Sequence, residues 1–171
     1  MEIEAIKKVR EEYQNLWVMI PYVHSPYELT QIKRILASEN LRRGESFKLW
    51  MMIELPVNVI LLEDFLGVGI DGVTIGSNDL TMLLLGVDRD NSELQSVFDE
   101  RSPALSWAFE RVIKSCRKRG VTTSICGQAP STYDSLVSEL VGLGITSISV
   151  NPDSVLRVKR VIAETEKNIL K

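Results

Sequence analysis

The sequence contains little of what marks several large classes of protein. One histidine and two cysteines among 171 residues exclude a histidine metal cluster and a disulfide framework, so both thiols are expected to be free. A balance of 20 basic against 23 acidic side chains gives a net charge of −3, which excludes the basic surface that nucleic acids or anionic membranes would require. No apolar run approaches the roughly 18 to 20 residues of a membrane helix, and the first residues lack the apolar segment of a signal peptide. We therefore expect a cytoplasmic protein with neither a nucleic-acid nor a membrane partner.

The chain is also short. A complete eight-unit β/α barrel usually takes about 250 residues, and 171 residues fall well below that number. A content of 44% hydrophobic and 25% charged residues is nevertheless typical of a globular domain with its own core. Because no linker or low-complexity segment interrupts the sequence, we expect residues 1–171 to form a single domain.

Strand-like and helix-like segments alternate along the whole sequence. Short apolar runs predict buried strands, and apolar residues at helical spacing predict the helices between them. The predicted strands are residues 16–23, 48–54, 72–75, 121–125 and 145–150. The predicted helices are residues 3–13, 25–41, 56–65, 80–85, 104–119, 131–143 and 153–170, with a polar stretch at 86–103. Five strands, each followed by a helix, predict an α/β fold with a parallel sheet and right-handed crossovers.

Polar side chains follow every predicted strand. In a parallel β/α sheet, ligands bind at the carboxyl ends of the strands, so these positions are the first candidates for a site. In chain order they are Tyr22 and His24, Glu54, Ser77, Asn78 and Asp79, Cys126 and Gln128, and Asn151 and Asp153. Helix capping is an equally good explanation for several of them, because Asn, Asp and Ser are preferred N-caps. The positions open to that explanation are Asn78, Asp79, Ser131 and Asp153.

Glu54 needs a different explanation. It directly follows the apolar residues 50–53, and a carboxylate at the end of a buried strand is costly unless a cation meets it. One alternative is an ion pair with a Lys or Arg of a neighbouring loop. The other is a divalent metal ion, with Asp79 as the second ligand one strand away. Hard cations such as Mg²⁺ take oxygen ligands and often use only one or two protein carboxylates, with substrate and water in the remaining positions.

The two cysteines are expected to differ. Cys116 falls in the middle of a predicted helix among apolar residues, and we expect it in the core. Cys126 ends a predicted strand, where a small buried apolar residue is the commonest interpretation. Its place at the same edge as Glu54 and Asp79 favours a second interpretation, a proton donor or acceptor in that site.

Six segments in the same order resemble the C-terminal part of the phosphoenolpyruvate synthase family. They are MMIELP (51–56), IGSNDLT (75–81), LGVDRDN (85–91), FDERSPA (98–104), ICGQAPS (125–131) and VNPDSV (150–155), preceded by WVMIPYV (17–23). ICGQAPS is the most specific, because the related pyruvate phosphate dikinases differ after the Cys-Gly pair. GIDGVTIGSNDL (69–80) is less specific, because metal-dependent pyruvate aldolases contain similar strings.

The resemblance implies a fold, a metal ion and a reaction. The fold would be a partial (β/α)8 TIM-type barrel, about the last five β/α units, that binds pyruvate or phosphoenolpyruvate on Mg²⁺, with Mn²⁺ as a substitute. By motif position, Glu54 and Asp79 correspond to the metal ligands, and Cys126 corresponds to the acid/base cysteine. The substrate-binding positions would be Glu54, Gly76, Ser77, Asn78 and Asp79. The complete enzyme converts ATP, pyruvate and water to phosphoenolpyruvate, AMP and phosphate by way of a phosphohistidine.

The sequence also departs from that family. Within these 171 residues we expect no ATP-binding domain, no phosphohistidine domain and no earlier barrel strands with phosphate-binding arginines, and His24 stands where many members have an arginine. Two hypotheses follow: the enolpyruvate part of such a phosphotransferase, incomplete alone, or a truncated barrel that serves as an assembly or regulatory element. A pyruvate aldolase is a weaker alternative, because ICGQAPS argues against it and no second histidine could act as a base. Unpaired edges of a five-strand sheet favour either a homo-oligomer or the N-terminal part of the enzyme as partner.

Overall fold

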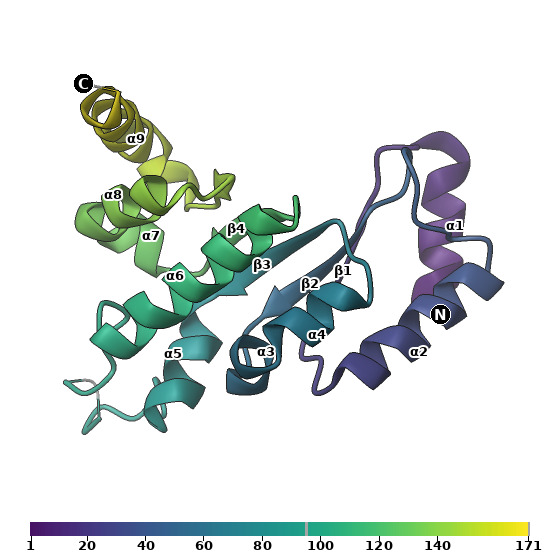
Figure 1. The fold of residues 1–171 in the computed structure, drawn as a ribbon, viewed down its shortest axis with the longest axis horizontal. Helices are drawn as coiled ribbons and strands as arrows, with labels where there is room; N and C mark the ends of the chain where they lie inside the picture. Colours follow the sequence, from purple (N-terminus) through teal and green to yellow (C-terminus); the bar gives the residue numbers. More distant parts are fainter. Residues whose placement is uncertain (95, 171) are drawn as a thin grey trace.

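The predicted parallel sheet is present in the computed structural model, which describes residues 1–94 and 96–170 (Figure 1). Its strands are β1 (Val18–Ile20), β2 (Leu49–Ile53), β3 (Gly72–Gly76), β4 (Thr122–Cys126) and β5 (Ser147–Ile148). They follow one another in the sheet as they do in the sequence, and every neighbouring pair is parallel. A parallel five-stranded α/β sheet is therefore confirmed, and its assignment to the last five units of an eight-unit barrel stays a prediction.

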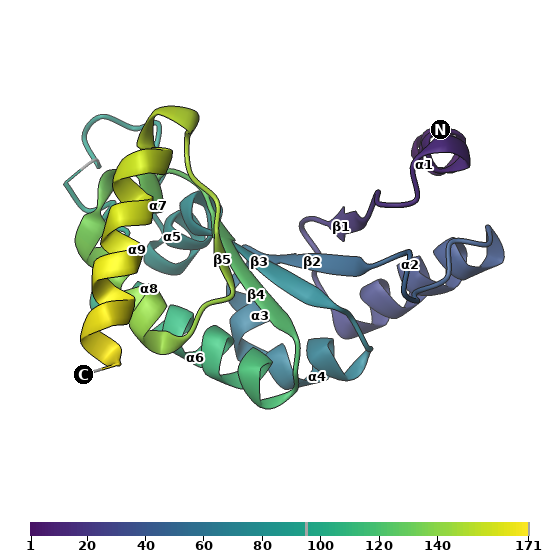
Figure 2. The ribbon, with the colours of Figure 1, turned by 90° about the horizontal axis from the view of Figure 1, so that it is seen from above.

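Helices connect all the strands. They are α1 (Glu2–Glu12), α2 (Pro26–Ser38), α3 (Pro56–Ile60), α4 (Leu62–Gly67), α5 (Ser77–Leu85), α6 (Pro103–Lys118), α7 (Ala129–Thr132), α8 (Asp134–Leu143), the 3₁₀ turn η1 (Pro152–Ser154) and α9 (Val155–Ile169). Helices α3, α4 and α6 lie on one face of the sheet, and the two chain termini lie at opposite ends of the molecule (Figure 2). In the described part of the chain, no helix has both the length and the apolar content needed to cross a bilayer.

Several predicted boundaries differ from the structure. The first and last strands have three and two residues, shorter than predicted, because each lies at an edge of the sheet and pairs on one side only. The predicted helix at 56–65 is two helices that meet at Leu61, and the one at 131–143 is divided at Tyr133. Helix α5 begins at Ser77, three residues earlier than predicted, so the polar residues after β3 form the first turn of a helix.

The core lies between the sheet and the helices α3, α4 and α6 that cover one of its faces. Alternate residues of β2 are buried on that side, and β3 is buried along its whole length because it is the central strand. Helix α6 contributes apolar side chains at helical spacing: Leu105, Ala108, Phe109, Val112, Ile113 and Cys116. Cys116 is thus in the core as predicted, and burial raises the pKa of its thiol to about 11.

The opposite face of the sheet is hollow. The rings of Trp17 and Trp50 stack there, with centroids 6.4 Å apart. A Cβ on Gly72 would lie 2.4 Å from Cε2 of Trp50, so only glycine lets the indole lie across the start of β3. The hollow measures about 390 Å³ and is lined by Trp17, Val18, Met19, Trp50, Thr74, Ser124, Cys126 and Ser149. This face therefore offers exposed aromatic surface and a half-buried thiol, whereas the aromatic side chains of the helix-covered face, such as Phe65 and Phe109, are fully buried in the core.

Candidate functional site

The carboxyl ends of β2, β3 and β4 bring three separate sequence segments together. Gly76, the last residue of β3, pairs with Cys126, the last residue of β4, and lies beside the position of Glu54. A Cβ on Gly76 would lie 3.2 Å from Cβ of Glu54 and 3.3 Å from its Oε2. The missing side chain of Gly76 therefore leaves the space that the Glu54 carboxylate occupies.

The Glu54 carboxylate is buried, and no described residue supplies it with a cation. Its residue is 3% exposed, and its Oε1 accepts a hydrogen bond of 2.6 Å from the backbone N–H of Tyr22. Burial raises the pKa of Glu54, the charge of Asp79 raises it further, and the Tyr22 hydrogen bond opposes both effects. Across residues 1–94 and 96–170, no ion pair includes Glu54. The ion-pair explanation of Glu54 is therefore wrong for the described residues, and the metal explanation remains.

Asn58 holds the backbone around Glu54 in place. Its Oδ1 accepts hydrogen bonds from the backbone N–H groups of Glu54, at 3.2 Å, and Leu55, at 2.9 Å. Its Nδ2 donates to the carbonyl oxygen of Val23 at 2.7 Å, and the side chain is fully buried. Asn58 thus ties the exit of β1 to the exit of β2. Sequence analysis missed this role, although a lone amide within an apolar helical segment is an uncommon core residue.

The first turn of α5 carries the residues that follow β3. Its N-cap is Gly76, which has no side chain that could cap, so Asn78 and Asp79 do not act as N-caps. Instead, Oδ1 of Asn78 accepts a hydrogen bond of 3.1 Å from the backbone N–H of Gln128 in the turn after β4. Asp79 is half-buried, and its charge helps to raise the pKa values of both Glu54 and Cys126. Asp79 lies in the first turn of α5, which directly follows β3, so it shares the edge of the sheet with Glu54 after β2 and with Cys126 at the end of β4.

Capping is also wrong for Ser131 and Asp153. Oγ of Ser131 lies within α7 and accepts a hydrogen bond of 2.9 Å from the backbone N–H of Asn151, which joins the turn after β5 to α7. Asp153 lies inside the 3₁₀ turn that Asn151 begins. His24, another candidate, is exposed, with its Nδ1 3.6 Å from Oε2 of Glu28.

Cys126 is half-buried and lines the hollow face of the sheet. Burial is the largest cause that raises the pKa of its thiol, and the negative charges of Glu54 and Asp79 raise it further. The thiol is therefore protonated near neutral pH as long as both carboxylates are charged. Such a group can donate a proton to a reacting carbon, and any cation placed on the two carboxylates would make it more acidic.

Glu100 is a site residue that sequence analysis missed. It comes from the polar stretch before α6, yet it is 6% exposed, and its Oε1 accepts a hydrogen bond of 2.9 Å from Oγ of the fully buried Ser77. Burial raises the pKa of Glu100, and hydrogen bonds from Ser77 and from the backbone of Ala129 oppose that effect. Glu100 therefore joins the first turn of α5 to the start of α7. The only signal in the sequence is that Glu100 belongs to the FDERSPA segment.

Gly127 allows the turns after β3 and β4 to approach each other. It adopts a φ of +103°, and a Cβ there would lie 2.2 Å from Oγ of Ser77 and 2.9 Å from Oδ1 of Asn78. The glycine that follows Cys126 is thus required by both its backbone conformation and its neighbours.

The donor set at this edge suits a hard divalent cation. Within the described part of the chain, no group of three or more His, Cys, Asp or Glu side chains could hold a metal ion. Glu54 follows β2 and Asp79 lies in the first turn after β3, at the same edge of the sheet, and the buried Glu54 carboxylate has no ion pair among the described residues. Mg²⁺ accepts such a pair, because substrate and water can complete its oxygen shell. The residues present therefore fit the metal ion that the sequence resemblance implied.

Comparison with known proteins supports a relationship over the whole chain. Residues 1–167 match the family described as PEP-utilising enzyme, PEP-binding domain. The phosphoenolpyruvate synthase of Aeropyrum pernix is 49% identical over 174 residues, which cover 99% of this chain and 21% of that enzyme. The enzyme of the same name from Helicobacter pylori is 46% identical, with 98% of this chain and 21% of that enzyme covered. The chain thus spans about a fifth of the length of these relatives.

A solved structure supports the fold alone. The crystal structure of RipC from Yersinia pestis superimposes with a TM-score of 0.61 over 94% of this chain and 69% of that chain, at 15% sequence identity. The family is shown by the sequence match: the chain belongs to the PEP-binding domains of the PEP-utilising enzymes.

Proposed function

We propose that the chain supplies the part of a phosphoenolpyruvate synthase-like phosphotransferase that binds pyruvate or phosphoenolpyruvate. The observation that carries this proposal is the buried Glu54 carboxylate, which has no cationic partner among the described residues and shares its edge of the sheet with Asp79 and Cys126. In this proposal the single domain 1–171 corresponds to the last five units of a β/α barrel, and the whole reaction joins ATP, pyruvate and water to give phosphoenolpyruvate, AMP and phosphate.

Glu54 and Asp79 would hold the metal ion, Mg²⁺ or Mn²⁺. When bound, a divalent cation would act as a Lewis acid on the negative charge that develops at the C2 oxygen of pyruvate. The two carboxylates would favour its binding, because a cation held by them would offset the burial cost and the repulsion that raise the pKa of Glu54.

The first turn of α5 would orient the substrate. The first backbone N–H groups of a helix have no partner within the helix, and they favour an anion such as the substrate carboxylate. Gly76, Ser77 and Asn78 occupy this turn, and the hydrogen bonds from Ser77 to Glu100 and from Gln128 to Asn78 fix its position. The side-chain oxygens of Ser77 and Asn78 are thus engaged within the protein, so the backbone is the part of this turn that faces the substrate.

Cys126 would move the proton. In the direction of enolate formation, the thiolate sulfur takes a proton from the methyl carbon of pyruvate, and the resulting thiol returns it to that carbon in the reverse direction. The enolate oxygen then accepts a phosphoryl group, which requires a donor. The only histidine of the chain, His24, is exposed and lies beside Glu28, with no contact to Glu54 or Cys126 among the described residues. We therefore assign the phosphohistidine and the ATP site to the N-terminal part of a full-length enzyme or to another chain.

A second candidate function is a non-catalytic assembly element. The hollow face with Trp17 and Trp50 favours it, because stacked aromatic rings on an uncovered face are typical of surfaces that bind another protein segment. In that case the carboxylates would be retained without metal binding, and the two proposals differ in their response to a divalent cation.

Thermal unfolding with Mg²⁺ or Mn²⁺ and oxalate, a mimic of the pyruvate enolate, tests the first proposal. We expect the melting temperature to rise only when metal and oxalate are both present, and we expect Glu54→Gln to abolish the rise. Glu139→Gln, which removes an exposed carboxylate on α8, is the matched control and should respond as the unaltered chain does. An absent rise in the unaltered chain, or an equal rise in Glu54→Gln, would contradict the metal site.

A further inference from the structure

The hollow on the open face of the sheet begins at the candidate site. Cys126 belongs to both, because it ends β4 at the site and also lines the hollow of about 390 Å³. We propose that the site takes 2-oxo acids with an apolar or aromatic substituent at C3, and that the hollow holds this substituent. The inference rests on the proposed function, because it assumes that the carboxylate and the C2 oxygen of the acid are held on a metal ion at Glu54 and Asp79.

The strand register places the hollow directly below the Cys126 thiol, toward the amino ends of the strands. Side chains at every second position of a strand point to the same face, so Ser124 lies below Cys126 on β4 and Thr74 lies below Gly76 on β3. Gly76 pairs with Cys126 and Thr74 pairs with Ser124, so these four residues form two successive levels on this face. Both levels carry small side chains, and Thr74, Ser124 and Cys126 all line the hollow.

An aromatic floor lies further down the same face. Trp50 is at the level of Thr122, four residues before Cys126, because both pair with Gly72. At roughly 3.3 Å per residue, this level lies about 13 Å below the thiol. The Trp50 ring stacks on the ring of Trp17, and both residues line the hollow. A substituent that extends downward from the thiol therefore passes small side chains and reaches flat apolar surface.

The volume of the hollow exceeds what pyruvate needs. Cavities of roughly 300 to 1,000 Å³ are typical of sites for small organic ligands, and this one measures about 390 Å³. Pyruvate has only a methyl group at C3, the carbon that would exchange its proton with the Cys126 thiol. With pyruvate bound, the rest of the hollow would hold water against the rings of Trp17 and Trp50, and an apolar substituent would release that water. The lining thus favours an apolar or aromatic group on C3.

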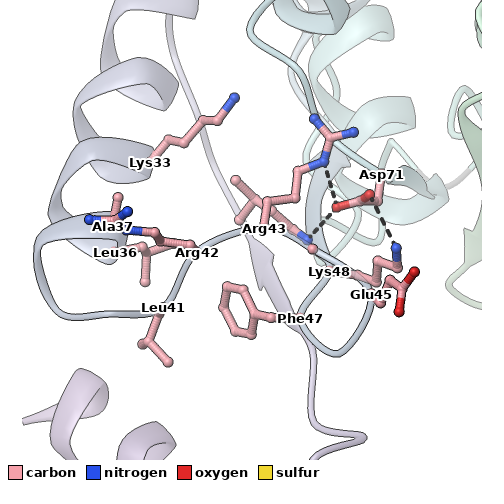
Figure 3. Close-up of a pocket in the computed structure, with 12 residues that line it drawn as sticks. Lys33, Leu36, Ala37, Leu41, Arg42, Arg43, Glu45, Phe47, Lys48 and Asp71 are labelled. Carbon is pink, nitrogen blue, oxygen red and sulfur yellow. Dashed lines mark hydrogen bonds and ion pairs between the residues drawn. The ribbon is translucent and has the colours of Figure 1, made fainter.

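Another cavity, about 570 Å³ in volume, has no such connection to the site. It lies at the amino ends of β2 and β3, where Lys48 and Asp71 directly precede the two strands (Figure 3). The Asp71 carboxylate is engaged within the protein, because its Oδ2 lies 2.9 Å from Nε of Arg43 and its Oδ1 lies 3.8 Å from Nζ of Lys48. Among the residues that the structure describes, neither Glu54 nor Cys126 lines this cavity. The hollow is therefore the cavity that continues the candidate site.

Calorimetric titration with two isosteres of 2-oxo acids, in the presence of Mg²⁺, tests the proposal. Oxamate has an amino group where pyruvate has its methyl group, and N-phenyloxamate carries a phenyl ring on that nitrogen, so neither compound can lose a C3 proton. We expect N-phenyloxamate to bind about tenfold more tightly than oxamate, the effect of burying roughly 60 Å² of apolar surface. Both compounds should lose their binding in Glu54→Gln, because both need the metal ion.

Substitutions in the hollow separate the ring from the rest of the ligand. Ser124→Leu fills the level below the thiol, so we expect it to remove the advantage of N-phenyloxamate and to leave oxamate binding unchanged. Ser135→Leu, the same change at an exposed position of α8, is the matched control and should bind both compounds as the unaltered chain does. Met19→Ala removes part of the lining on the edge strand β1, where the residue is 39% exposed, so this variant is expected to fold. It should weaken the binding of N-phenyloxamate alone.

Four results would overturn the inference. The two compounds bind equally well, or Ser124→Leu keeps the advantage of N-phenyloxamate as Ser135→Leu does, or Met19→Ala leaves the binding of N-phenyloxamate unchanged, or N-phenyloxamate still binds to Glu54→Gln. The last result would place the ring in the hollow without the metal site. Oxamate binding that needs both Mg²⁺ and Glu54 would support the proposed function in each of these cases, whereas a chain that binds neither compound would contradict both proposals.

Discussion

The backbone N–H of Tyr22 donates a 2.6 Å hydrogen bond to Oε1 of Glu54, and this contact lets the end of one strand orient the carboxylate at the end of the next. Tyr22 adopts a φ of 55°, a left-handed conformation that costs a non-glycine residue about 1 kcal/mol. This conformation occurs at the residue whose N–H group donates to the buried Glu54 carboxylate. The negative charge of Glu54 is thus met by one backbone donor and, among the described residues, by no cation. Several predictions depend on this uncompensated charge.

In metal-free buffer at neutral pH, Glu54→Gln should raise the melting temperature. The pKa of Glu54 is raised in the folded chain, so the charged form destabilises the fold above that pKa, and this cost disappears as the pH falls toward the ordinary value of 4.5. Glutamine keeps an oxygen that accepts from Tyr22 and removes the charge. We expect a gain on the order of 1 kcal/mol, or about 2 to 4 °C, at pH 7.

Melting temperatures of Glu54→Gln and of the unaltered chain, measured across a range of pH, test whether the substitution stabilises the fold. The advantage of Glu54→Gln over the unaltered chain should shrink as the pH falls and vanish below the ordinary carboxyl pKa. Glu139→Gln should show no such trend, since that side chain is exposed on α8. A loss of stability in Glu54→Gln at pH 7 without metal would mean that a cation partner of Glu54 had been removed.

The alkylation rate of Cys126 should depend on its acidic neighbours. Burial and the charges of Glu54 and Asp79 raise the pKa of this thiol, and only the thiolate reacts with iodoacetamide. In a background of Cys116→Ala, the rate should therefore rise at a higher pH than it does for an exposed cysteine. Asp79→Asn should shift the pH–rate profile toward lower pH, because it removes one of the two negative charges. An unchanged pH–rate profile in Asp79→Asn would mean that the charge of Asp79 does not act on the Cys126 thiol.

The residues at the carboxyl ends of the strands could be predicted from the sequence, because a polar residue directly after an apolar run marks the end of a buried strand. An apolar run that stops at Glu54, and another that stops at Gly76, gave the candidate residues, and parallel pairing was enough to bring them together. Asn58 and Glu100 could not be found in this way. Their roles depend on hydrogen bonds to residues 35 and 23 positions away in the sequence, and no periodicity encodes such contacts.

The lengths of the outer strands could not be predicted for a related reason. Residues 16–23 are apolar along nearly their whole length, and residues 145–150 alternate between apolar and small polar side chains. Both patterns predict full strands, but strand length also depends on the hydrogen-bonding partner. With one neighbour each, β1 and β5 keep three and two residues. Capping was wrong at Asn78 and Ser131 because tertiary backbone groups, those of Gln128 and Asn151, occupy their side-chain oxygens.

Two glycine substitutions should have opposite effects. Gly127→Ala places a methyl group 2.2 Å from Oγ of Ser77 at a φ of +103°, so we expect a loss of more than 1 kcal/mol and a weaker response to metal with oxalate. Gly142→Ala is the matched control, since no atom lies within 4 Å of the added methyl group inside α8. It should stabilise the chain by about 0.5 to 1 kcal/mol. Urea unfolding of both variants checks the pair, and equal effects would contradict the close approach of Gly127 to Ser77.

Removal of Glu100 should be costly although it lies in a polar stretch. Glu100→Ala leaves the buried hydroxyl of Ser77 without its acceptor, for which we expect a loss of about 1 to 3 kcal/mol. Glu93→Ala, at an exposed position of the same stretch, should change stability by less than about 0.5 kcal/mol. The double variant Ser77→Ala with Glu100→Ala should lose less than the sum of the two single losses. Additive losses would mean that the two side chains do not interact.

Proton exchange at the methyl group of pyruvate addresses the role of Cys126 directly. With Mg²⁺ in D₂O, we expect the chain to replace the methyl protons by deuterium, because the thiol lies at the same edge as the two carboxylates. Cys126→Ala should lower the rate about a hundredfold or more, the usual contribution of a positioned acid or base. Cys116→Ala removes the other thiol from the core and should leave the rate unchanged. NMR of the methyl signal measures the exchange. An equal rate in Cys126→Ala would exclude its thiol as the proton carrier, whereas metal-dependent exchange that is lost in Glu54→Gln would still support the metal site.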